Sequence, residues 1–173
     1  MTVDITQVCA PGLLRRLAAI LYDAALLIGV LMVAVALLVI PYSFLIGHPF
    51  PHEDPVHRSG LQGYLLLVIG SFFTFFWVRG GQTLGMRAWR ICVLRDDGEA
   101  LTWRDAWRRF FSAILALAPL GLGLFWALFD REGLAWHDRL SNTRLVMLAK
   151  PQRRRSADSP QEPEGAQQEQ ERR

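Results

Sequence analysis

The chain has 173 residues, of which 51% are hydrophobic and 20% charged, and its formal net charge at pH 7 is +3. This length suits one compact domain, and the apolar composition favours a membrane protein over a soluble one. The sequence contains no P-loop, nucleophile elbow, dinucleotide fingerprint or metal-ligand set, so we expect no enzymatic activity, no bound metal and no cofactor.

Three apolar runs are candidates for membrane spans, because a helix needs roughly 20 residues to cross the hydrocarbon core. They cover residues 17–40, 61–78 and 110–129. The first two predict full transmembrane helices. The first is too long for the apolar region of a cleaved signal peptide and lacks a small-residue cleavage site after it. The third contains Pro119, Gly121 and Gly123, which predict a break.

The basic residues orient the chain. Arg15 and Arg16 precede the first run, residues 41–60 carry only Arg58, and residues 79–109 carry seven arginines. The positive-inside rule therefore predicts that the N-terminus and the main basic loop, 79–109, are cytoplasmic.

The third run leaves two topologies open. The residues that follow it are also rich in arginine, which conflicts with a third full span. A helical hairpin bent near Pro119 would dip into the membrane and return, or lie along its surface. Three full spans remain the alternative.

Short elements are expected on the cytoplasmic side. The β-branched run 91–94 is followed by the turn dipeptide Asp97-Gly98 and could form a hairpin with residues around Leu101. The run 143–148 predicts a second strand, which could pair with 91–94 if both lie on one side of the membrane.

Thr102 and Asp105 have capping-box spacing for a helix that begins at Trp103. That helix carries basic and aromatic side chains together, a pattern typical of helices that lie on anionic lipid headgroups. They are Trp103, Arg104, Trp107, Arg108 and Arg109. Since membrane orientation already accounts for the arginines, we expect no nucleic acid as a partner.

The division of the chain follows from these elements. We predict an N-terminal cytoplasmic segment at 1–10, a membrane domain at 11–149 and a disordered tail at 150–173, where apolar residues are nearly absent. The predicted fold class is an all-α membrane protein with two full transmembrane helices. A third, broken or re-entrant helical segment and a small cytoplasmic cap with a β-hairpin or strands complete it.

Asp23 is the one charged residue inside the first run, roughly 9 Å from its start at helical rise. A carboxylate at this depth usually faces a partner within the protein. Arg16 shares its helix face but lies about 10.5 Å away along the axis, too far for firm direct pairing. We expect a bridging water, or a residue of another segment such as Arg139 or Arg79.

Three sequence blocks carry a family resemblance. They are "RRLAAILYD" at 15–23, "GQTLGMRAWRICVLRDDGEALTWRDAWRR" at 81–109 and "GLAWHDRLSNTRLV" at 133–146. In this order and spacing they resemble the RDD family of bacterial membrane proteins. The chain departs from the family pattern at Met86, where lysine is usual, and at Arg90, where glycine is common.

The resemblance implies a multi-pass protein of the bacterial cytoplasmic (inner) membrane. It also implies that Arg16, Asp23 and Asp138 are the residues for which the family is named. Other residues of the matching blocks are supporting candidates: Arg15, Gln82, Thr83, Gly85, His137, Arg139 and Thr143.

Two functions stay open. A desolvated Asp23 could exchange a proton for a cation, which would make the chain an ion- or proton-linked transporter, a role suggested for the family. Alternatively, Arg16, Asp23 and Asp138 form a structural clasp in a non-catalytic scaffold or accessory protein. The expected partners are the lipid bilayer, anionic headgroups, and further copies of the chain or a membrane protein.

Overall fold

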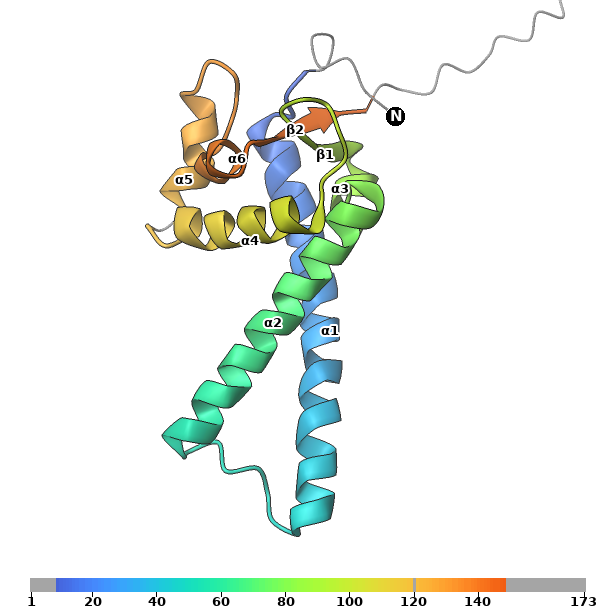
Figure 1. The fold of residues 1–173 in the computed structure, drawn as a ribbon, viewed down its shortest axis with the longest axis vertical. Helices are drawn as coiled ribbons and strands as arrows, with labels where there is room; N and C mark the ends of the chain where they lie inside the picture. Colours follow the sequence, from blue (N-terminus) through green and yellow to red (C-terminus); the bar gives the residue numbers. More distant parts are fainter. Residues whose placement is uncertain (1–8, 120, 149–173) are drawn as a thin grey trace, which may run out of the picture.

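Two long helices form the membrane part of the protein (Figure 1). The computed structural model describes residues 9–119 and 121–148. Helix α1 is Leu13–Ile46 and helix α2 is Pro55–Gly80, and both are long enough and apolar enough to cross a membrane. The two predicted spans lie within these helices, which extend beyond them at both ends.

The two helices lie close together at one end and diverge toward the loop that joins them (Figure 1). Asp54 caps the start of α2 by accepting from the amide of His57, and Gly81 ends α2 in the left-handed conformation. Between the helices, the Tyr64 hydroxyl donates to the carbonyl of Ala34 over 3.3 Å. With so little mutual burial, most of both helix surfaces is left to lipid.

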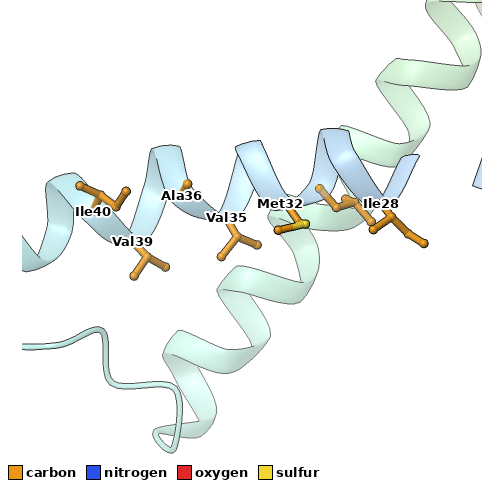
Figure 2. Close-up of a pocket in the computed structure, with 7 residues that line it drawn as sticks. Ile28, Met32, Val35, Ala36, Val39 and Ile40 are labelled. Carbon is orange, nitrogen blue, oxygen red and sulfur yellow. The ribbon is translucent and has the colours of Figure 1, made fainter. Parts of the chain in front are cut away.

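One face of α1 forms a shallow apolar hollow, shown in Figure 2. Its lining is entirely aliphatic or thioether: Ile28, Leu31, Met32, Val35, Ala36, Val39 and Ile40. No group in this lining can donate or accept a strong hydrogen bond, which is what a lipid-facing helix requires. The lining of this hollow therefore offers no polar group that could bind or react with a polar ligand.

The other described residues after α2 form a cap at the end where α1 begins and α2 ends (Figure 1). In chain order it consists of α3 (Leu84–Ala88), β1 (Ile91–Arg95), α4 (Trp103–Leu117), α5 (Leu122–Phe125), the 3-10 helix η2 (Trp126–Leu128), α6 (Trp136–Ser141) and β2 (Thr143–Met147). Its core joins Val93, Ala106 and Phe110 to Trp77 of α2. The cap is thus packed onto the helices.

The two strands pair with each other. β1 and β2 are antiparallel, with Ile91 opposite Met147 and Arg95 opposite Thr143. The predicted partnership of these runs is confirmed, whereas the predicted hairpin with residues around Leu101 is wrong. Leu101 instead buries its side chain in the core just before α4, because a long-range strand supplies the hydrogen bonds of β1.

The third apolar run is broken, as predicted. The Thr102–Asp105 capping box starts α4 at Trp103, and α4 is bent by 106° from the α5–η2 pair. α4 lies across the ends of α1 and α2 (Figure 1). Because β1 precedes this segment and β2 follows it, strand pairing requires both of its ends on one side of the membrane. This favours the hairpin topology and argues against three full spans.

Two predicted segments fall largely outside the described residues. The tail at 150–173 lies wholly outside them, as does most of the segment 1–10. Within the described part, Pro11 is buried at the start of α1, and the carbonyl of Cys9 accepts from the amide of Met147 over 3.1 Å.

Candidate functional site

A buried ion pair joins the start of α1 to α6. The guanidinium of Arg16 lies 3.2 Å from a carboxylate oxygen of Asp138, and both residues are nearly inaccessible, at 2% and 0% exposure. Arg16 also donates to the carbonyls of Pro11, over 3.1 Å, and Gly133, over 2.5 Å. Its donors are therefore shared between the loop before α1, the loop before α6 and α6 itself.

A second arginine shares the same carboxylate. Nη2 of Arg109, on α4, lies 2.7 Å from Oδ1 of Asp138, and Nη1 donates to the hydroxyl of Thr143. That hydroxyl also lies 2.7 Å from the hydroxyl of Ser141. We call Arg16, Arg109 and Asp138 the ion-pair cluster; it links α1, α4, α6 and β2 through charge-assisted contacts.

Asp138 is positioned by the first turn of α6. Its side chain accepts from the amide of Ala135 over 3.0 Å, which satisfies a donor at the helix start. Burial works to raise the pKa of Asp138, but Arg109 and Arg16 outweigh it and hold that pKa below its ordinary value. The carboxylate is therefore ionised at neutral pH.

His137 lies beside the cluster in the neutral state. Burial, followed by the positive charge of Arg109, lowers the pKa of His137 to about 4, although neighbouring Asp138 acts in the opposite direction. The imidazole consequently adds no charge at neutral pH, and two guanidinium groups share one carboxylate.

Asp23 makes a separate set of contacts. One carboxylate oxygen accepts from the amide of Gly85 over 2.8 Å, and the other accepts from the hydroxyl of Thr83. Thr83 in turn caps α3 by accepting from the amide of Met86 over 3.2 Å. Asp23, only 4% exposed, thereby attaches α1 to the start of α3.

Gly85 permits the close approach of α3 to α1. A Cβ atom at this position would lie 2.9 Å from Cγ of Asp23 and would also overlap the carbonyl oxygen of Ala19. Since backbone and a hydrogen-bonded carboxylate would both have to move, only glycine allows this contact without a shift of α3.

The expectation that Asp23 meets a residue of another segment is confirmed by Thr83 and Gly85, but the two arginines suggested for that role are wrong. Arg139 instead pairs with Asp130 over 2.5 Å, and the guanidinium of Arg79 lies 5.4 Å from the centre of the Phe75 ring. A neutral hydroxyl and a backbone amide suffice for Asp23 because they are already aligned at the start of α3.

The remaining supporting candidates lie around these two centres. The side-chain amide of Gln82 donates to the carbonyl of Ile91 over 2.6 Å, which ties the segment between α2 and α3 to β1. Arg15 is exposed and donates to the sulfur of Met147 over 3.4 Å. The structure therefore brings Arg16, Asp138, His137 and Thr143 together, while Asp23, Thr83 and Gly85 form a second group.

Arg109 is the functional residue whose role sequence reasoning missed. It was assigned to the headgroup-facing surface with Arg104 and Arg108, but it is 2% exposed while those two are exposed. Its spacing contained the signal: positions 106, 109, 110 and 113 share one helix face, and the other three are Ala, Phe and Ala. A single arginine on such a face indicates a buried partner.

A cavity of about 430 Å³ lies beside both centres. Arg16, Asp23, Arg109 and His137 form part of its lining, and most of the remaining lining is apolar. This volume falls within the range of roughly 300–1,000 Å³ that is usual for small-molecule pockets.

Two membrane-crossing helices with a packed cap and buried ion pairs define an integral membrane protein. The RDD family model matches residues 10–142, more than half of the chain, and the protein therefore belongs to the RDD family. No match was found among curated proteins or among solved structures.

The backbone at position 90 suits the glycine that the family resemblance predicts there. Arg90, which stands where glycine is common, has φ 56°, in the left-handed region that glycine adopts at no steric cost. Its carbonyl accepts from the amide of Leu148 over 2.9 Å, so the strained conformation is held by the approach to β2.

Proposed function

We propose that this chain is a non-catalytic scaffold or accessory protein of the membrane, in which Arg16, Asp23 and Asp138 act as a structural clasp. The clasp fastens a basic cap to two membrane-crossing helices. The observation that carries the proposal is that hydrogen bonds or ion pairs with protein groups already hold the oxygens of both buried carboxylates.

The contacts of the two carboxylates favour structure over transport: three of their four oxygens accept hydrogen bonds from the protein, and Oδ1 of Asp138 is held by its ion pair with Arg109. An exchangeable site needs an oxygen that can be released to a proton or cation, yet Asp23 fixes α3 and Asp138 fixes α6. Protonation of Asp138 would also leave Arg16 and Arg109 buried without their shared counter-charge, at a cost of several kcal/mol. Both carboxylates are thus suited to permanent contacts.

The surface of the cap supports a role at anionic lipid. Arg104 and Arg108 are exposed on α4, and the nearby aromatic rings of Trp89 and Trp103 are 43% and 51% exposed. Arginine heads with amphipathic rings beside them suit the headgroup layer. We propose that anionic headgroups and a membrane partner protein, or further copies of the chain, bind here, in the bacterial inner membrane with the cap cytoplasmic.

Ion- or proton-linked transport is the second candidate function. One observation favours it: Asp23 lies within a membrane-crossing helix and borders the cavity. Because two crossing helices per chain cannot enclose a path, this function would require a homo-oligomer.

Cation-triggered proton movement in everted membrane vesicles, followed with a pH-sensitive dye, separates the two functions. Wild type, Asp23→Asn and empty membranes are compared across monovalent cations at matched protein levels. We expect no signal above that of empty membranes. A wild-type signal that is lost in a normally inserted Asp23→Asn protein would refute the scaffold proposal and establish transport.

The lipid role is tested by measuring the anionic lipid that co-purifies with the protein in mild detergent. Replacement of Arg104 and Arg108 by Gln is expected to lower the retained phosphatidylglycerol. The matched control is Arg58→Gln, an exposed arginine at the opposite end of the helices. Equal retention by both variants would contradict the proposal.

A further inference from the structure

The cavity has a polar end and an apolar body. At the polar end lie Arg16 and Arg109 of the ion-pair cluster together with Trp77 of α2. The body is formed by α1, α4 and α5, with Ala113, Leu117 and Leu124 among its lining residues. A cavity with this division suits a molecule that is itself amphipathic.

Two buried donors at the polar end have no partner among the described residues. They are the indole Nε1 of Trp77 and the Nε of Arg109. Both residues are more than nine-tenths buried, at 8% and 2% exposure, and the Arg109 guanidinium lies 5.3 Å from the centre of a Trp77 ring. A buried N–H without an acceptor costs about 1–3 kcal/mol, so such a pair calls for an acceptor in the cavity.

The chemistry of these groups specifies the acceptor. An indole N–H and a guanidinium N–H can only donate, so the matching group needs acceptor oxygens and no donor. The ion-pair cluster has two guanidinium groups for one carboxylate, so the charge beside Arg109 is positive and favours an anion there. Asp23, the other carboxylate of the cavity lining, is bound to Thr83 and to the amide of Gly85. An ionised carboxylate meets both conditions, with two oxygens for two donors.

The apolar rim indicates where the ligand enters. Ile20 on α1, Ile114 on α4 and Phe125 on α5 line the cavity, yet they are 49%, 41% and 44% exposed. Exposed apolar side chains at the edge of a cavity next to a membrane-crossing helix allow a hydrocarbon chain to pass from the bilayer. A volume of about 430 Å³ suits one such chain better than the two chains of a phospholipid.

We propose that this cavity binds a single-chain carboxylate amphiphile of the fatty-acid class, with the carboxylate at Arg109 and Trp77 and the hydrocarbon chain between α1, α4 and α5. The ligand completes the polar end of the cavity by accepting from the two buried donors. This binding site is additional to the clasp function and does not depend on it.

The experiment is photo-crosslinking of the purified full chain in nanodiscs with a diazirine-bearing fatty acid, followed by peptide mapping. Unlabelled palmitate and its methyl ester serve as competitors, because the ester keeps the chain but loses the charge. Ala113→Phe fills the cavity wall. Its matched control is Ala24→Phe, at an exposed position of α1 outside the cavity. Trp77→Phe removes one unpaired donor and keeps a ring.

We expect saturable labelling of α1, α4 and α5. Palmitate should suppress this labelling at a concentration at least about tenfold lower than its methyl ester, because tenfold in affinity corresponds to one charge-assisted hydrogen bond. Ala113→Phe is expected to lower labelling about tenfold, Trp77→Phe to weaken palmitate competition, and Ala24→Phe to change neither. Equal competition by acid and ester in wild type would overturn the proposal without reference to any variant. Unchanged labelling in a folded Ala113→Phe protein would also overturn it.

Discussion

Replacement of Asp138 by Asn tests the energetic role of the ion-pair cluster. Asn keeps the size of the side chain and an oxygen for the amide of Ala135, but it removes the charge that Arg16 and Arg109 share. Both guanidinium groups would then be buried uncompensated, at 2% and 3% side-chain exposure. Breaking a buried pair in this way costs about 3–5 kcal/mol.

The matched control is Asp96→Asn. It removes the carboxylate of a solvent-accessible ion pair, in which Oδ1 of Asp96 lies 3.0 Å from Nε of Arg144. Side-chain exposures of 43% for Asp96 and 30% for Arg144 limit its expected cost to about 0–1 kcal/mol. Thermal unfolding of the purified proteins in detergent is the assay. At about 2–4 °C per kcal/mol, Tm should fall roughly 6–20 °C for Asp138→Asn and at most about 4 °C for the control. Equal shifts would refute the assignment of Asp138 as the shared counter-charge.

Three further predictions concern packing, pH and topology. Gly85→Ala should destabilise the protein by about 1–3 kcal/mol in the same assay, whereas Gly63→Ala, with open space around it, should not. Because the pKa of His137 is lowered from 6.5 to about 4 on folding, the unfolded state binds its proton more readily, and the contribution of His137 to stability should be constant above about pH 6.5. It should then fall between pH 6.5 and 4 by about 3 kcal/mol, a loss that His137→Gln should abolish. An impermeant maleimide should label exposed Cys9 in everted vesicles but not in intact cells, with buried Cys92 unreactive in both; labelling of intact cells would contradict the proposed orientation.

Much of the fold follows from local patterns in the sequence. Residues 17–40 and 61–78 are apolar over the thickness of a membrane, so their helices could be predicted without knowledge of any partner. The start of α4 could also be predicted from local sequence, because the capping box of Thr102 and Asp105 satisfies neighbouring backbone groups. The break near Pro119 follows from the properties of proline and glycine.

The contacts of the buried charges depended on tertiary structure. Sequence reasoning selected Asp23 because a carboxylate inside an apolar run needs a partner, and the family resemblance selected Asp138. Sequence spacing alone does not identify a partner 62 or 122 residues away. Asp23 binds Thr83 and Gly85 because α3 packs against α1, and Arg109 reaches Asp138 because α4 packs against α6.

The sequence by itself determined the two membrane-crossing helices, the start of α4 and the residue types that had to be paired. The length of an apolar run, the spacing of capping residues and the positions of helix-breaking residues depend only on residues close in sequence. They can therefore be recognised in one amino-acid sequence. Only the tertiary structure decided that β1 pairs with β2, that Arg109 is buried, and that a cavity lies between α1 and α4 with two donors that have no partner within the described part of the chain. These features arise where segments distant in sequence meet, and their energies depend on burial that no local pattern specifies.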